Sequence, residues 1–176
     1  MPHPDTGEIL WFNPDPRAII PLDGFHVSKS LARTLRKGTY TTTINTAFRE
    51  VMRGCASRDE TWITDEFIDV YGAMHDLGLA HSVEVWHDRH LVGGTYGVSL
   101  GGAFFAESMF HSEKDASKVA LHRLVEHMKS RGMTLLEVQF LTPHLKSLGA
   151  VEIRKDVYLK LLAQALAQRE RFADPA

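Results

Sequence analysis

The sequence predicts a single α/β domain in which helices flank a mixed β-sheet. Its 176 residues match the usual size of one domain. Three closely spaced strand candidates, at 82–86, 91–100 and 104–110, favour an antiparallel meander. A long helical pattern at 115–131 then leads to a strand candidate at 135–140, and this order favours a crossover into parallel pairing.

The N-terminal segment is rich in proline, with five prolines in its first 24 residues. Proline fixes φ and biases the preceding residue away from the helical region. We therefore predict an extended N-terminal arm with short strand pieces over residues 1–24, and one globular domain over residues 25–176. Trp11 and Phe12 can anchor the arm to that domain.

Five further segments have the periodicity of helices or strands. They are a helix at 28–37, a strand at 40–44, helices at 46–55 and 64–78, and an amphipathic helix at 158–167. Ser28 and Thr64 are suitable N-cap residues, because their hydroxyls can accept a hydrogen bond from a free N–H of the first turn. Gly38 and Gly132 are suitable residues for ending the helices that precede them.

Composition excludes several classes of protein. Lys and Arg number 20 against 22 Asp and Glu, so the chain is not a globally basic nucleic-acid coat protein, although a local basic patch is compatible with this balance. The single cysteine, Cys55, excludes an intramolecular disulfide and fits a reducing compartment. No stretch approaches the ~18 apolar residues of a membrane span, and the N-terminus is too polar for a signal peptide. We therefore expect a soluble cytoplasmic protein with no membrane partner, and the histidine spacing predicts no metal site.

Four basic residues share one face of the predicted helix at 28–37. They are Lys29, Arg33, Arg36 and Lys37, at i, i+4, i+7 and i+8. At 3.6 residues per turn they occupy an arc of about 100°, with Leu31 and Leu35 on the opposite face. Such a stripe can follow a phosphate backbone. An ordinary solvated face is the alternative.

Two polar groups interrupt apolar strand patterns. Glu137 and Gln139 fall on one face of the strand at 135–140, because side chains alternate along a strand. A carboxylate and an amide held together suit orienting an amine or moving its proton. Glu107 is a lone acid in the apolar strand at 104–110, where burial would require a partner or a cation. The alternatives are a half-exposed face for the first pair and a solvent-facing edge for Glu107.

Seven segments of the sequence together resemble one family. They are, in chain order, WFNPDPRA, TWIT, GLAHSVEVW, LVGGTYGV, ESMF, ASK and HLKSLGA. Over residues 9–160 the chain closely resembles the bacterial leucyl/phenylalanyl-tRNA–protein transferases. The resemblance implies a fold like that of the Gcn5-related acetyltransferases. It also implies transfer of Leu or Phe from aminoacyl-tRNA to the N-terminal Arg or Lys of acceptor proteins, which marks them for degradation in the N-degron pathway.

The resemblance implies no metal or organic cofactor. The family's N-terminal subdomain, which precedes the WFNPDPRA segment, is expected to be absent. Two other functions stay open: a coenzyme A-dependent acetyltransferase on the same fold, and a non-catalytic relative that binds tRNA or peptides. Against the first, the stretch 111–118 before the long helix has no glycine and two acids, which does not suit a pyrophosphate site.

The family's functional residues transfer to positions with matching motifs. Lys29, Arg33, Arg36 and Lys37 match its tRNA-binding patch, and Trp62 matches an active-site tryptophan near the aminoacyl-adenosine end. Glu107 and Gln139 match its active-site glutamate and glutamine, and Glu137 stands where the family has a catalytic aspartate. The resemblance implies an apolar pocket for the transferred amino acid, lined by Phe104, Met109, Leu121, Leu124 and Leu136.

Overall fold

The computed structural model describes residues 13–57 and 61–173, so the expected anchors Trp11 and Phe12 lie outside the described residues. One mixed sheet runs through this part of the chain. Its strands are β1 (Arg17–Ile20), β2 (Thr41–Ile44), β3 (Ala80–His87), β4 (His90–Leu100), β5 (Ala103–His111), β6 (Leu135–Gln139) and β7 (Val151–Ile153). The helices are η1 (Leu22–Gly24), α1 (Lys29–Lys37), α2 (Phe48–Ala56), α3 (Asp65–Asp76), α4 (Ala116–Ser130), α5 (Pro143–Ser147) and α6 (Lys155–Leu166).

The strand order is β2-β3-β4-β5-β6-β1-β7. The antiparallel meander β3–β4–β5 and the parallel pairing of β5 with β6 across α4 are both confirmed. β1 comes from the predicted arm and lies between β6 and β7, antiparallel to both. The mixed sheet flanked by helices that the sequence predicts is therefore the observed architecture.

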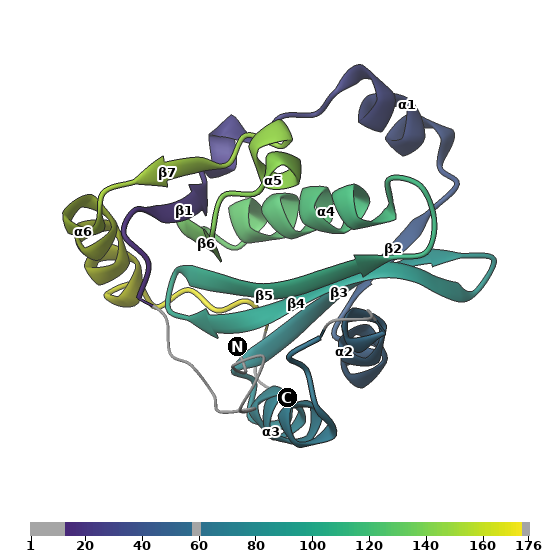
Figure 1. Cartoon of the computed structure of the whole chain (residues 1–176), viewed down its shortest axis with the longest axis horizontal. Coiled ribbons are helices and arrows are strands. Elements are labelled where there is room, and N and C mark those ends of the chain that lie inside the picture. Colours follow the sequence, from purple (N-terminus) through teal and green to yellow (C-terminus); the bar gives the residue numbers. More distant parts are fainter. Residues whose placement is uncertain (1–12, 58–60, 174–176) are drawn as a thin grey trace.

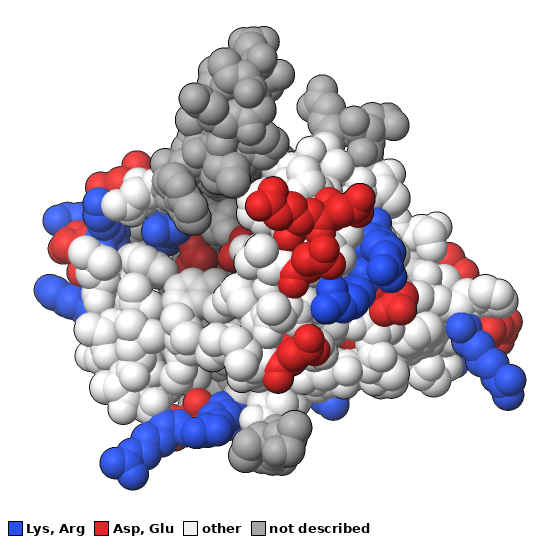
Figure 2. Space-filling view, turned by 90° about the horizontal axis from the view of Figure 1, so that it is seen from below, with Lys and Arg blue, Asp and Glu red and all other residues white. Residues whose placement is uncertain are grey.

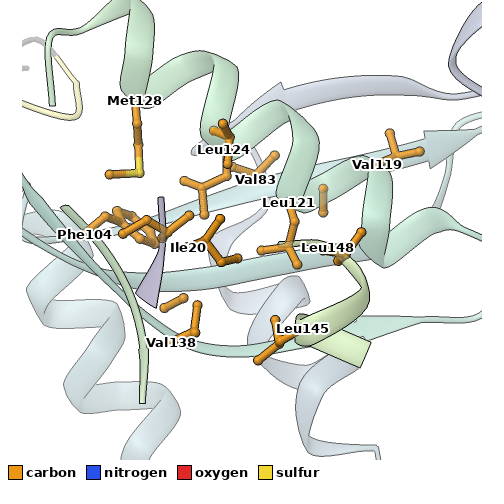
Figure 3. Close-up of a cluster of buried hydrophobic side chains, with 14 of the residues drawn as sticks. Ile20, Val83, Phe104, Val119, Leu121, Leu124, Met128, Val138, Leu145 and Leu148 are labelled. Carbon is orange, nitrogen blue, oxygen red and sulfur yellow. The ribbon is translucent and has the colours of Figure 1, made fainter. Parts of the chain in front are cut away.

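The helices cover both faces of the sheet (Figure 1). α4, α1 and α5 lie on one face, while α2 and α3 lie on the other. The main core fills the space between α4 and the sheet, where Leu121, Leu124 and Met128 pack against Phe104 and Val83 (Figure 3). None of the helices within 13–57 and 61–173 is both long and apolar enough to cross a membrane.

The helix ends follow the sequence signals. Ser28 Oγ accepts a hydrogen bond from Leu31 N at 3.2 Å, and Gly38 adopts the left-handed φ of 63° that ends α1. Thr64 caps α3 by accepting from Phe67 N. Leu31 is buried, as the amphipathic pattern of α1 requires.

Three elements lie outside the predictions: the single turn η1 within the predicted extended arm, and the elements α5 and β7. α5 has five residues and β7 has three, too few for either to show a hydrophobic period. α5 does carry a local start signal: Thr142 Oγ1 accepts from Leu145 N at 3.2 Å, and Pro143 occupies the first helical position.

Candidate active site

β5 and β6 separate after a short stretch of pairing, and this separation opens the site. Their parallel ladder joins Ala103–Phe105 to Leu135–Glu137, and beyond it β5 continues to His111 paired with β4 but not with β6. β6 ends at Gln139, whose φ of 62° lies in the left-handed region. That conformation costs about 1–2 kcal/mol for a residue other than glycine, and it ends the extended backbone of β6.

Glu107 reaches this opening from a β-bulge. In the β4–β5 ladder Tyr96 lies opposite Ser108, and the next β4 residue, Gly97, lies opposite Ala106. Glu107 is therefore the extra residue of β5, and a bulge redirects its side chain. A Cβ on Gly97 would collide with the β5 backbone, so glycine is required for this close approach.

A chain of polar contacts crosses the opening. The hydroxyl of Tyr71 on α3 interacts with the Glu107 carboxylate, which adds to the raised pKa of Tyr71 and opposes the rise in that of Glu107. Gln139 Nε2 donates to Glu107 Oε2 at 3.0 Å, and Gln139 N donates to Glu137 Oε1 at 2.9 Å. Arg17 Nη1 on β1 binds the same Glu137 oxygen at 3.2 Å. The structure thus brings the three predicted catalytic residues, Glu107, Glu137 and Gln139, into one network.

Burial sets the protonation behaviour of the two carboxyls. Desolvation raises the pKa of Glu107, against the opposing effect of its hydrogen bonds from Gln139 and Tyr71. Desolvation also raises the pKa of Glu137, and the Arg17 guanidinium opposes this shift. Both groups hold a proton more readily than a carboxyl in water, so either can take one from an ammonium group more easily.

The divergence of β5 and β6 holds a pocket of about 270 Å³. Its lining residues come from β4, β5, β6, α5 and the loop before α5. They are Thr95, Ala106, Glu107, Ser108, Met109, Val138, Thr142, His144 and Leu145. Of the five residues expected to form the amino-acid pocket, only Met109 is among them.

The other four expected pocket residues lie in the core. Phe104, Leu121, Leu124 and Leu136 are at most 1% exposed, and Figure 3 shows Leu121 and Leu124 of α4 in the same buried cluster as Phe104 of β5. They belong to the same core cluster as Val138, which lines the pocket. They therefore lie behind the pocket wall in this structure, and their contact with a substrate stays a prediction.

Trp62 is half-buried on the other face of the sheet, in the apolar cluster of α2 and α3. Its ring meets the Phe67 ring edge-on, with the two ring centroids 5.4 Å apart. The centroids of the Phe67 and Tyr71 rings are 6.4 Å apart. Trp62 is therefore linked to Glu107 through this row of aromatic rings. Its predicted place near the aminoacyl-adenosine end is not tested by these contacts.

The charged surfaces lie on opposite faces of the sheet (Figure 1). The four predicted tRNA-binding residues of α1, namely Lys29, Arg33, Arg36 and Lys37, are all exposed. α3 carries the exposed acids Asp65, Glu66, Asp69 and Asp76, and Figure 2 shows acidic side chains gathered on that face. Within residues 13–57 and 61–173, no group of three or more His, Cys, Asp or Glu side chains is placed to hold a metal ion.

Sequence reasoning missed three residues of this region as functional candidates. Arg17 and His144 lie in the WFNPDPRA and HLKSLGA segments, which could have drawn attention to them. Tyr71 has no such signal, because it is an ordinary member of the apolar face of α3. Only the fold brings its hydroxyl to Glu107.

Comparisons with known proteins identify the family. The family model of leucyl/phenylalanyl-tRNA protein transferase matches residues 19–163. A leucyl/phenylalanyl-tRNA–protein transferase of Herpetosiphon aurantiacus is 55% identical over 167 residues, covering 94% of this chain and 87% of that protein. One from a Ruegeria species is 52% identical over 172 residues, covering 98% of this chain and 82% of that protein.

Among solved structures, L-PGS from Bacillus licheniformis matches with a TM-score of 0.52 at 14% identity, covering 88% of this chain and 66% of that chain. This likeness shows the fold alone. The two relatives are more than 50% identical to this chain, and the family model matches most of its length. Together these findings establish the family. The chain belongs to the leucyl/phenylalanyl-tRNA–protein transferases, a family of aminoacyltransferases.

Proposed function

We propose that this protein transfers Leu or Phe from aminoacyl-tRNA to acceptor proteins with an N-terminal Arg or Lys, in the cytoplasm. The product then carries a residue that marks it for degradation in the N-degron pathway. The observation that carries the proposal is the polar chain from Arg17 through Glu137 and Gln139 to Glu107, at the wall of a pocket. The relatives' names supply the reaction class.

The chemistry requires positioning more than activation. The aminoacyl ester of the tRNA is already reactive, and the acceptor's amine attacks its carbonyl carbon. An amide bond forms, the ester C–O bond breaks, and the proton lost by the amine ends on the ribose oxygen. Holding amine and ester in contact can contribute several kcal/mol, roughly 7–11 in the most favourable cases.

Each polar residue has a distinct role in this proposal. The side-chain Nε2 of Gln139 donates a hydrogen bond to Glu107. Its Oε1 would therefore accept a hydrogen bond from the amine of the acceptor protein. Glu107, with its raised pKa, would take up the proton of the incoming ammonium. Glu137, bound to Arg17 and to the backbone N–H of Gln139, would hold the side chain of Gln139 in place.

The surfaces fit the two substrates. The exposed basic face of α1 would bind tRNA phosphates, and Met109, Val138 and Leu145 offer apolar contacts to the transferred side chain. The exposed acids of α3 lie on the element that also carries Tyr71, the partner of Glu107. Two of these acids, Asp69 and Asp76, pair with Arg49, and the negative charge that remains favours a cationic N-terminal residue over a neutral one.

Label transfer tests the proposal directly. Radiolabelled Leu-tRNA or Phe-tRNA is mixed with the protein and a peptide that begins with Arg, and label in the peptide is counted. A peptide that begins with Ala is the matched control for acceptor choice. Transfer to the Arg peptide is expected, at a rate well above that for Ala.

The outcomes separate the remaining alternatives. Absence of transfer from either tRNA, beside an active homologue, would overturn the enzymatic proposal. Binding of tRNA without transfer would favour the non-catalytic alternative. Acetylation of the same peptide from acetyl-coenzyme A would favour the acetyltransferase. Equal rates on Arg and Ala peptides would leave the transferase but remove the role of the acids in reading the acceptor.

A further inference from the structure

His144 lines the pocket from a firmly held position. It is the second residue of α5, directly after Pro143, and the Thr142 cap fixes the turn before it. Leu145 and Leu148 anchor α5 in the main core. The imidazole is therefore carried to the pocket on a packed element rather than on a free loop.

The His144 ring contains a buried polar atom with no partner. Its Nε2 is shielded from solvent, and no atom of the described residues forms a hydrogen bond with it. The great majority of buried polar atoms are paired, so an unpaired one beside a pocket needs an explanation. Nε2 becomes reachable when the atoms that cover it shift as the pocket fills, and a ligand group can then provide the missing partner.

The surroundings restrict the kind of ligand group. Desolvation lowers the pKa of His144, and Lys118 on α4 and His111 on β5 act in the same direction. The ring is therefore neutral near pH 7, and the ammonium group of Lys118 disfavours a second ammonium group as its partner. Glu107 lines the same pocket and disfavours an anion. A neutral oxygen, as in a hydroxyl or an ester, satisfies both conditions.

We infer that His144 is a substrate-binding residue whose Nε2 forms a hydrogen bond with an oxygen of the aminoacyl-ribose end of the tRNA. The inference rests on the proposed transferase function. The neutral imidazole can donate to an ester carbonyl or pair with a ribose hydroxyl. This bond fixes the ester next to Glu107 and Gln139, where the amine arrives.

Three variants separate a hydrogen-bonding role from a packing role. His144→Phe keeps an aromatic ring but has no polar atom. His144→Gln places its amide near the position of Nε2, and His144→Asn places it near that of Nδ1. The kcat/KM for Leu-tRNA is measured at saturating Arg peptide, together with the urea midpoint of each protein.

His144→Phe should lower kcat/KM by about 3–10-fold, the equivalent of one ordinary hydrogen bond. His144→Asn should match it, whereas His144→Gln should recover most of the wild-type value. The urea midpoint of His144→Phe should stay at or above that of the wild type, because no protein hydrogen bond is lost. Wild-type kcat/KM for His144→Phe, or a loss that Gln fails to rescue, would overturn the inference.

The wild-type reaction distinguishes this inference from the proposed function. If the wild type transfers label and His144→Phe is equally active, only the role of His144 fails. A tRNA that ends in 2′-deoxyadenosine, esterified at the 3′ oxygen, identifies the ligand atom. A penalty that vanishes on this substrate assigns the ribose hydroxyl, and a penalty that persists assigns the ester carbonyl.

Discussion

Replacing Arg17 by Met is expected to destabilise the protein in a strongly pH-dependent manner. The guanidinium lies 3.2 Å from Glu137, whose side chain is 3% exposed, while that of Arg17 is 18% exposed. Removing one partner of a fully buried pair costs ~3–5 kcal/mol. Because water reaches part of Arg17, we expect about 2–3 kcal/mol at pH 8.

The pH dependence follows from the pKa of Glu137. Burial already raises this pKa, Arg17 opposes the rise, and Arg17→Met raises it further. A carboxyl whose pKa is raised by folding weakens the fold above that pKa, and the penalty disappears as the pH falls through it. At pH 8 the free energy needed to protonate a carboxyl with the ordinary pKa of 4.5 is about 4.8 kcal/mol. This exceeds the free energy lost with the ion pair, so protonation does not relieve the deficit at pH 8. At pH 5 the same step costs about 0.7 kcal/mol, so the deficit should shrink to about 1 kcal/mol.

Urea unfolding at pH 5 and pH 8 tests this reasoning with four proteins: wild type, Arg17→Met, Glu137→Gln and the double variant. In the double variant no buried charge is left unpaired, so it should be more stable than Arg17→Met at pH 8. A small residual deficit is expected at both pH values, because Arg17 also lies 4.9 Å from the centre of the Tyr158 ring. The reasoning is refuted if the Arg17→Met deficit is equal at the two pH values, or if Glu137→Gln brings no rescue.

Three further predictions address tRNA binding, catalysis and acid stability. Replacing Arg33 and Arg36 by Ala should weaken tRNA binding and reduce the slope of log affinity against log salt concentration by about one per lost phosphate contact. The urea midpoint should stay unchanged. An unchanged slope would mean that this face of α1 is only solvated. Glu137→Asp should keep or raise turnover at unchanged tRNA affinity. Glu137→Gln should lower turnover by ~10²-fold, because it weakens the pairing with Arg17 that holds Gln139 in place; full activity of Glu137→Gln would show that this pairing does not position Gln139. His81 is 3% exposed and burial lowers its pKa to about 4, so the fold should lose up to about 3 kcal/mol as pH falls from 6.5 to 4. His81→Gln should flatten the fall in urea midpoint over that range, and an equally steep fall in this variant would contradict the assignment.

Local signals account for the elements that the sequence predicted correctly. The Ser28 hydroxyl and Gly38 act within one turn of α1, so their effect can be read without knowing the rest of the fold. The long periodic stretch of α4 and the strand after it also indicated the parallel pairing of β5 with β6. In each case the cause lies in neighbouring residues.

The geometry of the site depends on causes that are distant in sequence. The bulge at Glu107 requires the register of β5 against β4 and the missing Cβ of Gly97. Alternation placed Glu137 and Gln139 on one strand face, but Gln139 is left-handed and ends the strand, and its contact to Glu137 is made by its backbone N–H. Strand alternation cannot anticipate a residue that leaves the extended conformation.

The pairing of Arg17 with Glu137 joins residues 120 positions apart in the sequence. β1, which carries Arg17, has both of its neighbours in the sheet, β6 and β7, in the last third of the chain. At ribosomal rates of ~5–20 residues per second, Arg17 is made roughly 6–24 s before Glu137. During this interval the pairing of Arg17 with Glu137 cannot form, and β1 has neither of its neighbours in the sheet. Completion of the candidate site is thus delayed until the C-terminal strands emerge from the ribosome.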